Sequence, residues 1–589
     1  MGHEKPIRSG PPPSSWIAGP AQDLSLIVGT PLLILPAMLL ARSLWTETSI
    51  VLFVAAFGQL GHNLPGMMRA YGDRALFRRF PIRFVVAPAG LLLLCVIAVV
   101  YQLHGLILVS AVWAIWHALM QTFGFVRIYD AKMKSFNCQT RWLDFAITLT
   151  WFGGAIVLCD RPTSLLLTHF YNSGGPALPA SALAVVRCVW LAALVIATLL
   201  FLFNTVRQAR RREPISSVKI SLLIISIAFY WYAYAGAAHI LVGAAMFEVF
   251  HDVQYLTIVW LFNRKRAQSD QRVGTFTRFV FGRSGALVGV YLGLIFAFGS
   301  LRYVEDAMSA GLVRDVLAGF IAAMGLLHYY YDGFIWKVRE PQTRATLELA
   351  GSAEKWRAMA VPRMTHVAKW ALFVIPLGLL GWMQVRWEPT EQSQLAALAA
   401  TFPQDVSVQF NNGQVLESSR LWQPAAAAYR RAIQLAPDMA QAHLRLGVVL
   451  RHEHRLASSE MHLRHAVRLI PTAADARIHL ARTLVGRSKP ADAERELEAA
   501  VRLAPESFQA LSNLGIVRAM TGKLAAAETA FRAAVELSPQ DAGAHFNLAN
   551  VLRDQGKLDA AAFHLRCALE ADPRFAAARQ QLRKLENDS

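Results

Sequence analysis

Long apolar runs recur from residue 23 to residue 387, and they constrain the fold of this chain more than any other feature. Most of them have the 17–25 residues that a helix needs to cross a hydrocarbon core about 30 Å thick. Charged residues make up only 17% of the chain, whereas a typical soluble domain has about 25%. We therefore predict a polytopic membrane domain of about eleven spans. The predicted spans are residues 24–42, 49–71, 83–102, 105–127, 142–159, 182–205, 218–236, 239–262, 284–301, 311–331 and 367–386.

Basic loops give the predicted spans an orientation. A cluster of arginines and lysines follows every even-numbered span, whereas the odd-numbered connections carry few charges. The basic residues are Arg74, Arg78, Arg79, Arg83, Lys132, Lys134, Arg141, Arg207, Arg210, Arg211, Arg212, Arg264, Lys265, Arg266, Arg272, Arg278, Arg283, Lys337, Arg339 and Arg344. By the positive-inside rule the N-terminus is cytoplasmic, and an odd number of spans places everything after Arg386 in the periplasm of a bacterial inner membrane.

The same loops account for the net charge of +19, so we predict no nucleic-acid partner. The five cysteines include no CxxC spacing, which excludes a disulfide scaffold and a cysteine-based zinc ribbon.

From about residue 405 the sequence repeats with a period of 34. Prolines recur at Pro437, Pro471, Pro505, Pro539 and Pro573, and alanines at Ala432, Ala466, Ala500, Ala534 and Ala568. Small residues occupy Gly413, Gly447, Ala481, Gly515 and Ala549, and large ones occupy Tyr429, Leu463, Leu497, Phe531 and Leu565. Small residues let two antiparallel helices approach, bulky residues fill the gap between them, and each proline ends the second helix.

This pattern resembles the tetratricopeptide repeat (TPR) family. The fold class that we predict is therefore all-α: a transmembrane helical domain at 1–390, a linker at 391–405 and a TPR α-solenoid at 406–589. The solenoid would have five repeats and a capping helix at 576–588. The resemblance implies a superhelix whose concave face binds a protein or peptide, and it implies no catalysis. The histidines scattered through the array are expected to be solvated or packed helix residues, with a bound metal as the alternative.

Ionisable residues inside the predicted spans carry the functional signal, because they are costly there. His62, His117, His251 and His328 lie in spans that run in the same direction, at similar depths. Glu248, His251, Asp252 and Tyr255 share one helix face, and Asp332 lies one turn after His328. We predict the four histidines as metal ligands and Glu248, Asp252, Tyr255 and Asp332 as catalytic groups.

Imidazoles and carboxylates from several helices suit non-haem iron or another transition metal, with haem b as the alternative. The arrangement is loosely similar to the bacterial β-carotene dioxygenase family of integral membrane proteins. We therefore expect a membrane metal-dependent oxidoreductase acting on a lipid-like or isoprenoid substrate. Two alternatives stay open at this point: a TPR scaffold of a cell-envelope complex, and an acyltransferase or transporter that uses the same histidines.

Overall fold

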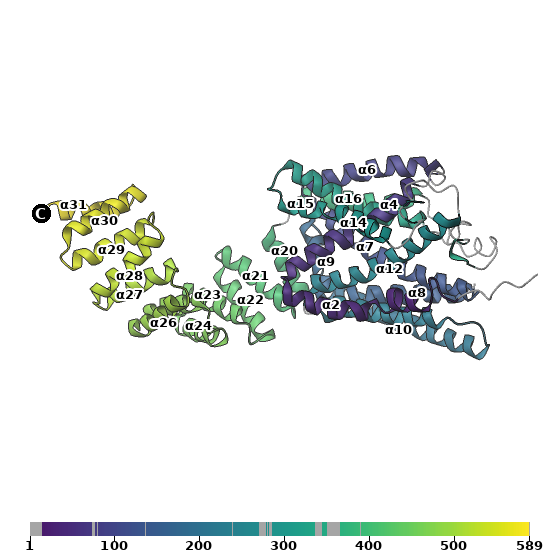
Figure 1. The fold of residues 1–589 in the computed structure, drawn as a ribbon. Coiled ribbons are helices and arrows are strands. Elements are labelled where there is room, and N and C mark those ends of the chain that lie inside the picture. Colours follow the sequence, from purple (N-terminus) through teal and green to yellow (C-terminus); the bar gives the residue numbers. More distant parts are fainter. Residues whose placement is uncertain are drawn as a thin grey trace, which may run out of the picture. The chain divides into compact units, whose positions relative to one another are not determined.

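A computed structural model describes residues 15–72, 77–78, 80–135, 137–237, 239–269, 278–279, 281, 286–335, 344, 346–349, 366–388 and 390–587. Within these residues the chain is helical and contains no strand, as the sequence predicts. The chain divides into two compact units, Met1–Thr390 and Glu391–Ser589. Figure 1 shows the helices of both units.

The first unit is built from apolar helices, several of which are long. Its described helices are α1 (Pro20–Gln22), η1 (Asp23–Val28), α2 (Thr30–Leu44), α3 (Glu47–Phe53), η2 (Val54–Leu60), α4 (Asn63–Gly72), α6 (Pro81–Val100), α7 (Gly105–Lys132), α8 (Cys138–Val157), α9 (Asp160–Asn172), α10 (Ala180–Arg210), α11 (Ser217–Trp231), η3 (Tyr232–Gly236), α12 (Ile240–Ser269), α14 (Ala286–Gly299), α15 (Leu301–Ala307), α16 (Leu312–Ile335) and α19 (His366–Trp387). The segments η1, η2 and η3 are π-helical.

Six described helices are long and apolar enough to cross a membrane, and two bent pairs could raise the number to eight. The six are Glu47–Met68, Pro81–Val100, Gly105–Lys132, Ala180–Arg210, Ser217–Gly236 and Leu312–Asp332; the bent pairs are Pro20–Val28 with Thr30–Leu44, and Cys138–Val157 with Asp160–Asn172. The predicted count of eleven is therefore not confirmed. Among the described residues, the spans expected at 239–262, 284–301 and 367–386 are not among these candidates. Residues 284 and 285 of the second of these spans lie outside the described part of the chain. Polar residues such as Glu248, His251 and Asp252 interrupt the apolar sequence of α12.

A buried network of four charged groups joins three helices of this unit. Lys219 Nζ on α11 donates to Asp144 Oδ2 on α8 at 2.7 Å and to Asp130 Oδ2 on α7 at 3.1 Å. Arg127 Nη1 donates to Asp130 Oδ2 at 2.6 Å. Two cations and two carboxylates balance one another, which offsets part of the cost of burying charge.

The second unit consists of antiparallel helix pairs that follow one another along the chain (Figure 1). Its helices are α20 (Glu391–Thr401), α21 (Val406–Ser418), α22 (Trp422–Leu435), α23 (Ala440–His452), α24 (Leu456–Leu469), α25 (Ala474–Gly486), α26 (Pro490–Leu503), α27 (Phe508–Met520), α28 (Leu524–Leu537), α29 (Ala542–Asp554), α30 (Leu558–Ala571) and α31 (Ala576–Asn587). Residues 391–405, which we expect to be a linker, contain α20. This helix packs on α21, where Gln409 Nε2 donates to Ala399 O at 3.0 Å.

The predicted pairing of small with large residues is confirmed. A Cβ added at Gly413 would lie 2.6 Å from the Tyr429 ring, and one added at Gly515 would lie 2.8 Å from the Phe531 ring. The second helix of each pair ends two residues before its proline, as at Leu435 before Pro437. The 34-residue pattern therefore corresponds to the packing contacts within each helix pair.

Candidate metal centre

His62 stands where the backbone changes from π-helix to α-helix. The π-helical segment η2 ends at Leu60 and α4 begins at Asn63, so His62 lies between them. Its Nδ1 is 2.5 Å from the Gly58 carbonyl oxygen and 3.0 Å from Asp252 Oδ1 on α12. Because a carbonyl oxygen only accepts, Nδ1 carries the proton, and the lone pair of neutral His62 is on Nε2.

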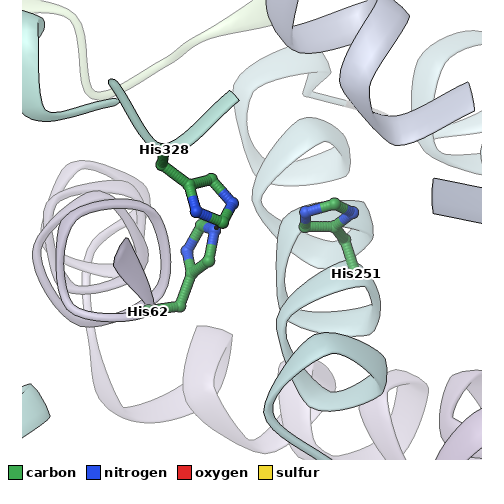
Figure 2. Close-up of side chains that lie close together, drawn as sticks. All are labelled: His62, His251 and His328. Carbon is green, nitrogen blue, oxygen red and sulfur yellow. Dashed lines mark hydrogen bonds between the residues drawn. The ribbon is translucent and has the colours of Figure 1, made fainter. Parts of the chain in front are cut away.

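The unprotonated Nε2 of His62 faces a second histidine. His62 Nε2 is 3.0 Å from His328 Nε2 on α16. Figure 2 shows the two imidazoles against each other, with His251 of α12 facing them. One ligand atom from each of these three histidines lies within 4.8 Å of the others, and all three side chains are buried. Three helical segments that are far apart in the sequence thus deliver imidazoles to one place.

The fourth predicted histidine borders the same cluster. The ring centroid of His117, on α7, is 5.0 Å from that of His251 and 4.9 Å from that of His328. Asp332 Oδ2 lies 3.5 Å from His328 Nε2 and 3.9 Å from His117 Nε2. Tyr255 donates its hydroxyl proton to Asp332 Oδ1 at 3.2 Å.

The two carboxylates of α12 lie beside His62. His62, Glu248 and Asp252 each offer a ligand atom within 4.8 Å of the others. All eight residues singled out in the sequence therefore belong to one connected cluster, with Glu248 and Asp252 at one end and His117 and Asp332 at the other. Their chemical roles stay a prediction.

Two glycines allow the helices to approach at this cluster. A Cβ at Gly58 would lie 2.5 Å from Asp252 Oδ2, and a Cβ at Gly66 would lie 2.9 Å from the Tyr255 hydroxyl. Larger residues at these positions would displace the Asp252 carboxylate and the Tyr255 hydroxyl, so the glycines are part of the site's construction.

Several buried polar atoms of the cluster have no hydrogen-bond partner among the described residues. They are Nε2 of His117, Nδ1 of His328 and both carboxylate oxygens of Asp252. The Asp252 Oδ1 contact with His62 is close in distance, but His62 Nδ1 directs its proton to Gly58 instead. Unsatisfied buried nitrogen and oxygen atoms are expensive. This donor set fits a transition metal, because imidazole and carboxylate are the ligands that such ions take.

Sequence reasoning missed some members of the cluster's surroundings. Asn63, next to His62, is buried, and neither of its amide atoms has a hydrogen-bond partner in the described part of the chain. The Tyr329 ring centroid is 4.6 Å from that of His117. Gln121 was not missed: one turn after His117 in the sequence, it is expected to hold an imidazole, but it donates to the backbone oxygen of His251 at 2.9 Å instead. An asparagine inside an apolar run was the available signal for Asn63, whereas nothing in the sequence distinguishes Tyr329 from its tyrosine neighbours.

The fold of the second unit defines a helical-repeat protein. Within it, the tetratricopeptide repeat family matches residues 410–474, 479–542 and 530–562. The chain therefore contains TPRs, as the sequence predicts, and such repeats are protein-interaction modules.

Solved TPR structures are similar to part of this chain. YrrB, a TPR protein with an unusual peptide-binding site, shows 23% identity and a TM-score of 0.28, covering 32% of this chain and 96% of YrrB. MamA from Desulfovibrio magneticus shows 18% identity and a TM-score of 0.28, and the match covers 29% of this chain and 97% of MamA. A thermophilic TPR protein from Thermus thermophilus shows 19% identity and a TM-score of 0.27, and the match covers 31% of this chain and 98% of that protein. Comparison with curated proteins found no match.

Proposed function

We propose that this chain is an integral-membrane, metal-dependent oxidoreductase for a lipid-like or isoprenoid substrate, with the TPR unit docking a protein partner. The observation that carries the proposal is the buried pair His62 and His328, whose Nε2 atoms lie 3.0 Å apart. His251 and His117 complete a set of four imidazoles around them. A chain that needed only a membrane anchor has no use for so many ionisable groups among apolar helices.

The spacing of the rings favours a small ion over haem b. Two axial histidines of a haem lie on opposite faces of a wide macrocycle. The His62 and His328 rings have centroids only 4.5 Å apart, which leaves no space for a porphyrin between them. Non-haem iron is the first candidate, because histidine with carboxylate is its usual ligand set.

The surrounding residues have distinct roles in this proposal. His62, His117, His251 and His328 hold the ion, which supplies redox or Lewis-acid chemistry when bound. The Gly58 carbonyl fixes the tautomer of His62, and the Asp252 carboxylate lies 3.0 Å from the same nitrogen. Tyr255 and Asp332 share a hydrogen bond beside His328, so they are the pair best placed to hold or move a proton. Glu248 adds a second carboxylate beside His62.

An apolar substrate suits the location of the cluster. His62, His117 and His328 all belong to helices that are long and apolar enough to cross a bilayer. A substrate dissolved in the membrane would reach such a cluster without crossing water. The topology that we propose places the N-terminus in the cytoplasm and the TPR unit in the periplasm.

Metal analysis of the detergent-purified full-length protein, with an optical spectrum, tests the proposal. The wild type is compared with the double variant His251→Ala/His328→Ala and with the control His104→Ala/His239→Ala, whose two histidines are exposed and lie outside the cluster. We expect one or two irons per wild-type chain, retained in the control and lost in the His251/His328 variant. Well-folded wild-type protein without a stoichiometric redox metal would overturn the oxidoreductase and favour the scaffold.

A further inference from the structure

Two of the five repeats carry potential metal ligands at the same three positions of the repeat, and two of the three residues are identical. In the fifth repeat these residues are His545 on α29 and His564 and Cys567 on α30. In the second repeat His443, His462 and His465 stand 102 residues earlier, which is three periods of 34. The corresponding positions of the third repeat are Arg477, Glu496 and Ala499, so the pattern is not a general requirement of the fold.

The ligand atoms of the fifth repeat converge. His545 Nδ1 is 3.0 Å from His564 Nδ1. One nitrogen of each histidine and the Cys567 sulfur all lie within 4.8 Å of one another. His564 and Cys567 are three residues apart on one helix, so they project from the same face.

A backbone carbonyl orients the first imidazole. His545 Nε2 lies 3.1 Å from Pro539 O in the loop between repeats. The carbonyl can only accept, so Nε2 carries the proton and Nδ1 of neutral His545 presents a lone pair toward His564 and Cys567. Histidine ligands of metals are commonly held in this way, by a hydrogen bond from their other nitrogen. His443 makes the same contact with Pro437 O at 3.0 Å.

We propose that His545, His564 and Cys567 form a metal site for Zn²⁺ or a similar divalent transition-metal ion in the fifth TPR. Two imidazoles and one thiolate are borderline-soft ligands of the kind that Zn²⁺ takes. A tetrahedral ion with bonds of about 2.0–2.3 Å holds its ligand atoms roughly 3.3–3.7 Å apart. The ligand atoms lie within 4.8 Å of one another, so binding would draw them together to that spacing. Water would take the fourth position, and the Cys567 thiol would lose its proton to solvent on binding.

The ion would join α29 to α30 near the end of the solenoid, where only α31 follows. This site is separate from the membrane cluster and does not depend on the proposed oxidoreductase activity.

Cobalt titration of the purified, reduced, chelator-treated full-length protein tests the site. Co²⁺ bound by a thiolate gives a ligand-to-metal charge-transfer band. The histidines and carboxylates of the membrane cluster cannot produce this band, because they include no thiolate. We expect a band that saturates at about one Co²⁺ per chain and is bleached by Zn²⁺. Cys567→Ala should abolish the band, and His545→Ala should weaken cobalt binding at least 10-fold. Far-UV circular dichroism checks that each variant is folded.

Two further variants use the register of the repeats. In the Cys567→Ala background, His465→Cys places a thiolate beside His443 and His462, and it should restore the band. Ala499→Cys places a cysteine at the same register without the two histidines, and it should not. The proposal is overturned if folded wild-type protein gives no band, if the band survives Cys567→Ala, or if Ala499→Cys binds Co²⁺ as tightly as the wild type does.

Discussion

At the scale of single residues, the membrane cluster depends on how His62 is held. Its Nδ1 faces the Gly58 carbonyl and Asp252, and its Nε2 faces His328. A carboxylate beside Nδ1 of an imidazole raises the basicity of Nε2, and a more basic Nε2 binds a metal ion more strongly. Asp252 is thus a positioning residue in our interpretation, and the metal would be held by the histidines.

The substitution Asp252→Asn tests this role. It keeps the size of the side chain but removes its charge, and we expect metal affinity to fall about 10–100-fold. Thr257→Val on the same helix is the control, because the Thr257 hydroxyl donates to the Val253 carbonyl at 2.7 Å, its one hydrogen bond among the described residues. Metal content after dialysis against a graded chelator series measures the difference. Equal affinity in Asp252→Asn and wild type would show that the carboxylate does not support His62.

The sequence reveals some of these residues and hides others, for a physical reason. A histidine or carboxylate in an apolar run is costly, so its position alone marks it, and the eight predicted residues do lie together. The close approaches at Gly58 and Gly66 depend on how η2, α4 and α12 cross, and the partner of Gln121 depends on how α7 meets α12. No periodicity encodes those crossings, because they arise from contacts between segments distant in the sequence.

At the scale of helices, the small residue of each TPR pair is matched to its large partner. Glycine faces an aromatic ring at Gly515–Phe531 and a leucine at Gly447–Leu463, whereas Ala481 and Leu497 occupy the same positions of the third repeat. The space beside the small residue therefore depends on the large residue opposite it.

Gly515→Ala should therefore destabilise the fourth repeat. The new methyl group would lie 2.8 Å from the Phe531 ring, and overpacking of this kind costs about 1–3 kcal/mol. Adding Phe531→Leu recreates the alanine–leucine pair and should recover part of the loss. Hydrogen exchange of α27 and α28 in the full-length protein measures both variants. If the losses of stability from Gly515→Ala and Phe531→Leu simply add in the double variant, the two residues are not matched to each other.

A series of Glu–Lys ion pairs, called the ladder below, also recurs with the 34-residue period. Glu460, Glu494 and Glu528 are 34 residues apart, and each accepts from a lysine 29 residues later. Lys557 Nζ lies 2.6 Å from Glu528 Oε2, and Lys523 Nζ lies 2.7 Å from Glu494 Oε2. These pairs connect successive repeats, which contact only their neighbours.

Acid should weaken this ladder. Hydrogen bonding from Lys557 lowers the pKa of Glu528 from its usual 4.5 to about 2. A carboxyl with a lowered folded-state pKa contributes stability above pH 4.5, and this contribution is lost as the pH falls from 4.5 toward 2. Because Lys557 is half exposed, we expect about 0.2–1 kcal/mol for the pair. Thermal melts of Glu528→Gln and wild type should therefore converge near pH 2 and separate above pH 4.5. A constant separation at every pH would contradict this assignment.

At the scale of the whole molecule, the number of membrane crossings decides where the TPR unit meets its partner. The 34-residue period made the repeats predictable from sequence, because each repeat packs only on its neighbours. Crossings are harder to predict, because a polar helix such as α12 can be buried inside the unit, and bent pairs such as α8 and α9 can cross or return. An odd count places the N-terminus and the repeats on opposite sides, and an even count places them on the same side.

Thiol labelling in intact bacterial cells tests the predicted sides. Cys138, at the start of α8 and just after the connection from α7, is exposed and predicted to be cytoplasmic. One variant keeps Cys138 as its only cysteine, and a second has only the substitution Gln509→Cys at an exposed position of α27. A membrane-impermeant maleimide should label the Gln509→Cys protein in intact cells and the Cys138 protein only after permeabilisation. Labelling of both proteins only after permeabilisation would require an even number of spans and a cytoplasmic TPR unit, so the partner would then be a cytoplasmic protein.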